Sequence, residues 1–269
     1  MKHKLIRNAA RQFAETELSP IAAEIDQRRI FPRDVIAKMR GLNYFGLQVP
    51  KEYGGAALDS ISAAIVVEEL SRVSAAVGLC VTVHNGVAVY PFLQFANTEQ
   101  KNKYLPQLAA GDVIGAFSLT EANAGSDAGS VETTAVKTGS DYVLNGTKIF
   151  VTNGGVCGVA LIFALTSSPD NKLQSSVFIV ESGFPGFLRG ELEDLCGMRA
   201  NPVSSLFFED CRVPGENLLG KLGDGMKIGL ATLDNGRIGV AAQALGIAQG
   251  AMEAAVKYAK ERQQFKKPI

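Results

Sequence analysis

The stretch DYVLNGTKIFVTN, Asp141 to Asn153, contains two runs rich in β-branched and aromatic residues on either side of Asn145-Gly146. A type I′ turn needs positive φ at both central positions, and asparagine followed by glycine meets that need best. The stretch therefore predicts a β-hairpin that turns at Asn145 and Gly146.

Further short β-rich runs surround this stretch between residues 113 and 222. They are VIGAFSL, VETTAVKT, VALIFAL, SSVFIVE and SSLFFED. No helical segment separates them, so we expect antiparallel connections and a small β-barrel or sandwich, and not a βαβ sheet.

The flanking regions have helical periodicity. In residues 1–112 apolar side chains recur every three to four positions, Asp59 and Ser60 offer an N-cap to the long segment ISAAIVVEELSRVSAAVGL, and Gly111 closes a helix over 100–110. Within residues 223–269 the stretch MKIGLATLDNGRIGVAAQALGIAQGAMEAAVKYAKERQQF predicts one helix of roughly 60 Å if unbroken. The expected fold class is α+β with three domains: a helical domain 1–112, a β-barrel or sandwich 113–222, and the start of a helical bundle 223–269 that is incomplete at Ile269.

Composition excludes several kinds of function. The 269 residues carry 27 Lys and Arg against 27 Asp and Glu, which argues against binding of nucleic acid or a membrane through bulk charge. The longest nearly apolar run, 73–83, is short of a membrane span, and the N-terminus lacks the apolar centre of a signal peptide. We therefore expect an intracellular protein, cytoplasmic in a bacterium or in the mitochondrial matrix of a eukaryote.

Metal binding is not expected. The four cysteines form no CxxC pair, and the chain has two histidines, His3 and His84. We expect all four cysteines to be buried thiols and His84 to lie at a helix end or turn.

Five motifs in order carry a family resemblance: VPKEYGG, LTEANAGSD, NGTKIFVTNGG, FEDCRVPGENLLG and GRIGVAAQALGIAQGAMEAAVKYAKERQQF. With the helical, β, helical order they resemble the acyl-CoA dehydrogenase family over the whole chain, most of all its short-chain (butyryl-CoA) members. The resemblance implies an FAD enzyme that converts a short-chain acyl-CoA to the trans-2-enoyl-CoA. It also implies a homotetramer that passes electrons to an electron-transferring flavoprotein.

The chain has no GxGxxG start of a Rossmann helix, so loops and strand ends must hold the flavin. The resemblance places Thr120 at the pyrimidine edge of the flavin and Thr152 near N5. Arg262 of ERQQF would reach the FAD of a neighbouring subunit. The cofactor residues implied are Phe117, Leu119, Thr120, Gly125, Ser126, Phe150, Thr152, Arg262 and Phe265. Without the resemblance, LTEANAGSD would be interpreted as a solvated turn capped by Asp127.

The stretch LDNGRIG resembles the segment that lines the acyl-CoA pocket. It makes Asp234, Asn235, Gly236 and Arg237 candidate substrate residues, together with Ser126. An exposed i,i+3 ion pair of Asp234 with Arg237 explains the same pattern equally well.

The catalytic base in relatives is a glutamate at the position of Gly236 or in a loop near the C-terminus. Glycine inside a helix fits a site where substrate approaches the backbone closely. Glu121, Glu253 and Glu261 are poorly placed by sequence. We therefore expect no catalytic residue in this chain and a base beyond Ile269.

Two other functions fit the same motifs. An enoyl-CoA reductase would run the chemistry in the opposite direction. A flavin- or CoA-binding assembly module would bind the same molecules without turnover.

Overall fold

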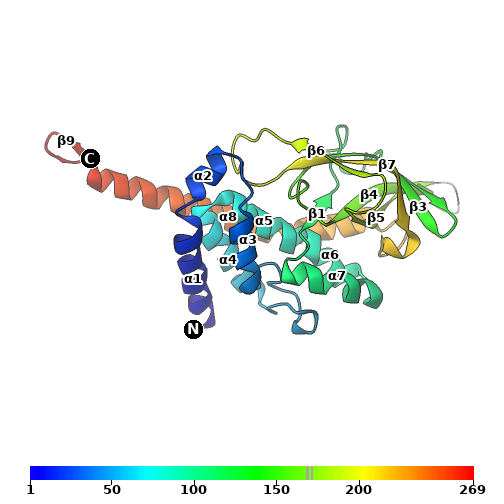
Figure 1. Cartoon of the computed structure of the whole chain (residues 1–269), viewed down its shortest axis with the longest axis horizontal. Coiled ribbons are helices and arrows are strands. Elements are labelled where there is room, and N and C mark those ends of the chain that lie inside the picture. Colours follow the sequence, from blue (N-terminus) through cyan, green and yellow to red (C-terminus); the bar gives the residue numbers. More distant parts are fainter. Residues whose placement is uncertain (168–169, 171) are drawn as a thin grey trace.

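A computed structural model describes residues 1–167, 170 and 172–269, and its helical and β regions follow one another along the chain as expected (Figure 1). The fold class is confirmed. The helices before the sheet are α1 (Lys2–Phe13), α2 (Ala22–Gln27), α3 (Arg33–Gly41), α4 (Ser60–Val73), α5 (Ala75–Val83), α6 (Tyr90–Phe95) and α7 (Thr98–Ala110), with π-helical turns η1 (Ala14–Leu18) and η3 (His84–Val89).

Local capping explains several helix ends. The Asp59 carboxylate accepts a hydrogen bond from the Ser62 amide at 2.7 Å and so begins α4. Gly111, with φ of 73°, ends α7. The expected long helix after Asp59 is wrong, because Ser74 is extended (φ −140°) and separates α4 from α5. The bend lays Gly78 of α5 against Ser71 of α4, where any larger residue would overlap the serine side chain.

The strands are β1 (Gly115–Ser118), β2 (Thr134–Thr138), β3 (Asp141–Val151), β4 (Val159–Ser167), β5 (Leu173–Glu181), β6 (Phe187–Leu192), β7 (Ser204–Pro214) and β8 (Leu218–Leu219). Their order is β6-β7-β3-β2-β4-β5-β8, with β1 also paired to β4. Most pairs are antiparallel, as expected, but β1–β4 and β2–β4 are parallel. Both faces of β4 are buried, which explains its unbroken apolar run.

The predicted hairpin at Asn145-Gly146 is wrong. Strand β3 runs through both residues, and the two-residue turn lies at Gly139 and Ser140, between the paired Thr138 and Asp141. Gly146 has φ of 150° beside a register shift, and a Cβ there would lie 2.8 Å from Thr133 Cα. The glycine therefore permits a close strand approach and not a turn.

Helix α8 (Gly225–Glu261) is unbroken over 37 residues, about 55 Å at 1.5 Å per residue. It packs along α4 and α5, and its C-terminal part projects away from the body together with β9 (Gln263–Gln264) and β10 (Lys267–Pro268) (Figure 1).

The continuous helical stretch Ala75–Phe95 is long and apolar enough to cross a membrane, which the shorter run counted in the sequence did not indicate. Because 61% of its most apolar window is buried inside the protein, it has the character of a core helix.

His84 directly follows the last residue of α5, so the expected position at a helix end is confirmed, and its side chain is fully buried between the helices and the sheet. Its Nδ1 accepts a hydrogen bond from the Gly115 amide at 2.9 Å, so the proton is on Nε2, which donates to the Leu108 carbonyl at 3.0 Å. Burial lowers the pKa of His84 to about 4. The neutral imidazole thus joins the end of α7 to β1.

We expect this histidine to make stability depend on pH. The unfolded chain takes up the proton near pH 6.5 and the folded chain only near 4, so His84 supports the fold fully above pH 6.5 and progressively less as the pH falls toward 4. The loss amounts to about 3 kcal/mol. Urea unfolding between pH 7 and 4.5 checks this, with His84→Gln as the comparison. Equal pH slopes in the two proteins would contradict it.

Candidate active site

The two threonine motifs lie side by side. Strand β1 ends at Ser118, and the chain then turns through Glu121 and Ala124, whose backbones bond to each other. The Ile149 amide of β3 donates to the Thr120 carbonyl at 3.0 Å. Thr120 therefore lies against Ile149 of β3, and Thr152 follows Ile149 by three residues along the same chain segment.

Both threonines present unused donors. Thr120 and Thr152 are half-buried, and within the described residues neither their amides nor their hydroxyls have a hydrogen-bond partner. Backbone donors in such positions are normally bonded, so two neighbouring free amides suit a planar ligand with acceptor atoms along one edge. Donors of this kind fit the edge of a flavin, and the assignment of Thr120 to the pyrimidine edge and of Thr152 to N5 stays a prediction.

Lys148 is a residue of this site that the motif comparison missed. It is fully buried, and its Nζ donates to Glu121 Oε1 at 2.6 Å and to the Leu119 carbonyl at 3.1 Å. Strand alternation could have found it, because Lys148 is in phase with the buried Tyr142 and Leu144.

Glu121 is held on both carboxylate oxygens. The Glu132 amide donates to Oε2 at 2.6 Å, and the Thr133 amide donates to Oε1 at 3.1 Å. Burial opposes ionisation of Glu121, but the bonds from Lys148 and these amides outweigh it and lower its pKa. Burial lowers the pKa of Lys148 to about 8 despite Glu121. Both groups are therefore mainly charged at pH 7, and Glu121 is a weak base.

Asn153 fixes the chain directly after Thr152. It is fully buried with φ of 64°, and its side-chain amide donates to the carbonyls of Cys80 in α5 and Gly115 in β1 at 3.3 and 3.4 Å. Its Oδ1 accepts from Asn201 at 3.1 Å. These bonds hold the chain at Thr152 against α5 and β1.

The other predicted cofactor residues differ in exposure. Leu119 is buried, and Phe117 is half-buried with its ring edge-on to Phe163 at 5.0 Å. Phe150 is 61% exposed with φ of 54°, so its ring is presented to solvent beside Thr152. Gly125 and Ser126 are exposed in the turn after Ala124.

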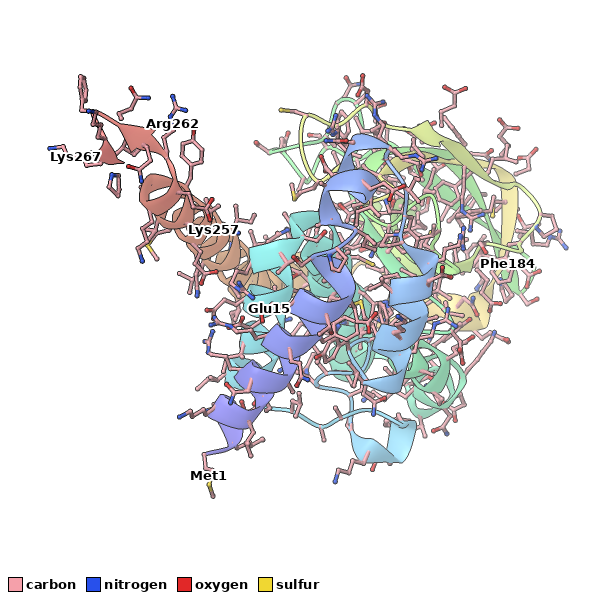
Figure 2. The ribbon with its side chains drawn as sticks, turned by 60° about the vertical axis from the view of Figure 1, so that its left-hand side comes forward. Met1, Glu15, Phe184, Lys257, Arg262 and Lys267 are labelled. Carbon is pink, nitrogen blue, oxygen red and sulfur yellow. The ribbon has the colours of Figure 1, made fainter. Side chains whose placement is uncertain are left out.

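Arg262 and Phe265 lie elsewhere. Arg262 follows the last turn of α8 and is labelled on the projecting arm in Figure 2, far from Phe184 of the β region. Phe265 is 92% exposed on the same arm. The structure does not bring either residue to the threonine motifs of its own chain.

A groove of about 540 Å³ runs between α5, η3 and α8. Its lining is Thr82, Val83, Val87, Leu233, Gly236, Arg237, Val240, Ala241 and Ala244. Arg237 is the one charged residue in this lining. The groove therefore suits an apolar group whose polar end lies near a cation.

The four α8 candidates divide between two faces. Gly236 and Arg237 line the groove, whereas Asn235 donates to the Gly86 carbonyl at 2.8 Å. Asp234 is exposed, with Oδ1 3.6 Å from Arg237 Nε, so the ion pair inferred as the alternative is present. A Cβ on Gly236 would lie 2.6 Å from Val87 Cγ1. Within this chain the close neighbour of Gly236 is therefore Val87, and the approach of substrate to the same helix backbone stays a prediction.

Cysteine burial was predicted for all four thiols and is wrong for one. Cys80, Cys157 and Cys211 are buried, but Cys196 is exposed.

Three family models match the chain: the acyl-CoA dehydrogenase N-terminal domain over 1–112, the middle domain over 116–211 and the C-terminal domain over 223–269. A short-chain specific acyl-CoA dehydrogenase from Clostridium acetobutylicum is 48% identical over 98% of this chain and 70% of its own length. An acryloyl-CoA reductase (NADH) from Anaerotignum propionicum is 46% identical over 100% of this chain and 68% of its own.

Solved structures agree with these matches. A chain from the structure of an electron transferring flavoprotein of Acidaminococcus fermentans superposes with a TM-score of 0.96 and 47% identity, over 99% of this chain and 70% of that one. An acyl-CoA dehydrogenase complexed with FAD from Bacillus anthracis gives 0.93 and 35%, over 99% of this chain and 45% of that one. The chain belongs to the acyl-CoA dehydrogenase family of FAD-dependent oxidoreductases.

Proposed function

We propose that the protein catalyses α,β-dehydrogenation of a short-chain acyl-CoA to the trans-2-enoyl-CoA with FAD as cofactor. The observation that carries this proposal is the pair of free amides at Thr120 and Thr152 on adjoining strand ends. The apolar groove beside Gly236 and Arg237 supports it as the place of the acyl group. When FAD is bound, it accepts the β-hydrogen as hydride.

The residues of this chain then have distinct tasks. The Thr120 and Thr152 amides would donate to the flavin edge, and the Phe150 ring would contact the flavin beside them. Gly125 and Ser126 let the chain approach a phosphate or pantetheine closely, and Arg237 would attract the CoA. Phe117 and Leu119, which precede Thr120 in the chain, would pack beneath the flavin-binding loop.

We also propose the domain division 1–112, 113–222 and 223–269, which the extents of the three family models support.

Assembly supports a role for Arg262 and Phe265. Large apolar side chains along α8 are exposed, among them Leu230, Val240 and Met252. We propose that copies of this chain form a homotetramer, in which Arg262 grips the FAD of a neighbour bidentately. The electron acceptor would be an electron-transferring flavoprotein, as the Acidaminococcus neighbour supports. The place of action is the cytoplasm of a bacterium or the mitochondrial matrix, and neither nucleic acid nor a membrane is a partner.

Anaerobic assays on the FAD-loaded protein test the direction of the reaction. We expect butyryl-CoA to reduce the flavin or a coupled dye, and crotonyl-CoA with reduced nicotinamide cofactor to show no comparable rate. The opposite preference would select the reductase, a function that the Anaerotignum relative has by name. FAD and thioester binding without either reaction would select the assembly module.

A glutamate placed at Gly236 should restore α-proton removal. No carboxylate is among the residues that line the groove, and the Glu121 carboxylate already accepts hydrogen bonds from three donors, Lys148 and the amides of Glu132 and Thr133. We therefore expect no exchange of the α-proton of butyryl-CoA into deuterated water by this 269-residue chain with FAD. Because Val87 blocks a side chain at Gly236, the variant tested is Val87→Ala with Gly236→Glu.

Exchange should rise about a hundredfold in this double variant, the usual contribution of a positioned base. The matched control is Val87→Ala with Gly236→Gln, which has the same volume without the base. Exchange by the unaltered chain would mean that a residue within it already acts as base, and equal rates in the two double variants would refute the assignment of Gly236.

A further inference from the structure

A buried lysine beside the flavin loop requires an explanation beyond packing. Moving an ammonium out of water costs several kcal/mol, and an ion pair can often be replaced by apolar residues without loss of stability. Strand β3 already buries Tyr142 and Leu144 on the same side as Lys148. An apolar residue at position 148 would therefore serve the core as well.

We propose that Lys148 is a positioning residue which polarises the Leu119–Thr120 peptide, strengthens the Thr120 amide as a donor to the flavin, and so favours the reduced flavin. The proposal rests on the function proposed above, since it takes Thr120 to face the flavin edge.

The geometry links the lysine directly to that amide. Lys148 Nζ bonds the Leu119 carbonyl oxygen at 3.1 Å, and this carbonyl belongs to the same planar peptide unit as the Thr120 N–H. A cation on the oxygen withdraws electron density through the conjugated unit, so the N–H becomes more acidic and a stronger donor. No other charged side chain bonds this peptide within the described residues.

The surrounding bonds keep the donor aimed outward. Ile149 of β3 holds the Thr120 carbonyl at 3.0 Å, and Glu121 is held by Lys148 and by the amides of Glu132 and Thr133. Both peptides that flank Thr120 are thus anchored to β3 or its neighbour. Of the polar groups in these two peptides, only the Thr120 N–H has no protein partner within the described residues.

The consequence for the cofactor follows from charge. Two-electron reduction places negative charge on the pyrimidine side of a flavin, so a strong donor there stabilises the reduced form more than the oxidised form. Lys148 therefore raises the reduction potential of bound FAD. A lysine that served only to hold the loop would change the affinity for both forms equally.

The experiment measures the midpoint potential and the FAD dissociation constant of the holoprotein. The variants are Lys148→Met, which keeps an unbranched side chain but removes the ammonium group, and Glu121→Gln, which keeps the cation and removes its counter-charge. We expect Lys148→Met to weaken binding of reduced FAD about tenfold relative to oxidised FAD, a fall of about 30 mV for a two-electron couple. Glu121→Gln should not lower the potential. An unchanged potential in Lys148→Met would overturn the proposal.

Lys148→Met alone leaves the Glu121 carboxylate buried without its cation, and that variant can fail to fold for this reason. A combined variant removes both charges and so avoids the problem. Lys148→Met with Glu121→Gln leaves a neutral pair whose amide oxygen can still accept from Glu132 and Thr133, and it should show the same fall in potential. A double variant with the wild-type potential would equally contradict the role of the charge.

A measurement without flavin separates this inference from the proposed function. By NMR, base-catalysed hydrogen exchange of the Thr120 amide should be several-fold slower in Lys148→Met than in the wild type, since the polarising cation is gone. Faster exchange would mean that Lys148 only restrains the loop. A wild-type protein that takes up no FAD would refute the proposed function, and the exchange rates would still decide whether Lys148 polarises the peptide.

Discussion

Glu69→Ala is expected to lower the free energy of unfolding by about 4 kcal/mol, the usual cost of breaking a buried ion pair. The Glu69 carboxylate in α4 is fully buried and accepts hydrogen bonds from Arg7 at 2.5 Å and Arg11 at 2.8 Å. Arg72 Nε lies 3.4 Å from the same group. Alanine would leave three guanidinium groups together without their central counter-charge.

Loss of Glu69 should also affect the candidate site, because the same charge network holds α8, which forms one wall of the groove. Arg72, whose side chain is only 10% exposed, also bonds Glu253 of α8 at 2.8 Å, so the network fixes α8 against α4. Urea unfolding gives the change in stability. The control is Glu15→Ala, because Glu15 bonds Arg72 at 2.8 Å but is 56% exposed, and its loss should cost less than about 1 kcal/mol. Equal losses in the two variants would show that burial of Glu69 is not what matters.

Gly246→Ala is expected to destabilise the protein by about 3 kcal/mol, although the same change usually stabilises a helix by about 1 kcal/mol. Gly246 is buried where α8 crosses α4. A Cβ there would overlap the Glu68 carbonyl oxygen and lie 3.0 Å from the Arg72 amide. Both are backbone atoms of α4, which cannot move aside without separating the helices.

Thermal or urea unfolding checks the sign of this effect. Gly41→Ala is the matched control, because Gly41 also lies in a helix, α3, and a Cβ on it meets no atom within 4 Å. We expect Gly41→Ala to be neutral or slightly stabilising. A stabilising Gly246→Ala would mean that α4 and α8 are not packed as closely as described, and the groove wall formed by α8 would be in doubt.

Sequence signals a few residues apart predicted the helices and their ends better than they predicted which residues contact one another in the fold. The Asp59 cap, the Gly111 end of α7 and the unbroken α8 depend on residues a few positions apart, so the sequence shows them. The hairpin at Asn145 and Gly146 failed because a distant residue decides it. Asn145 exchanges hydrogen bonds with Asp210 of β7, which holds β3 extended where the local preference is to turn.

The candidate site shows the same division. LTEANAGSD and FVTNGG identified Thr120 and Thr152 as neighbours by resemblance, and the bond from Ile149 to Thr120 accounts for their closeness. Lys148 was in phase with the buried residues of its strand, but nothing local indicates that its ammonium meets Glu121 and the Leu119 carbonyl. Glycine at position 236 predicted a close approach to the helix backbone, and the fold alone shows that Val87 lies there within this chain.

The sequence by itself determined the order of helical and β regions, the ends of several helices, the family and its cofactor. Periodicity, caps and motifs are written in residues near one another, and they need no knowledge of the rest of the chain. The tertiary structure alone decided the charge network at Glu69, the neutral His84 between α7 and β1, and the contact of Lys148 with the Thr120 peptide. The bonds of Arg7 to Glu69, of His84 to Leu108 and of Lys148 to Leu119 join residues 62, 24 and 29 positions apart. Burial removes water as the competing partner, so the choice of ionisation and hydrogen-bond partner is made only when those segments meet.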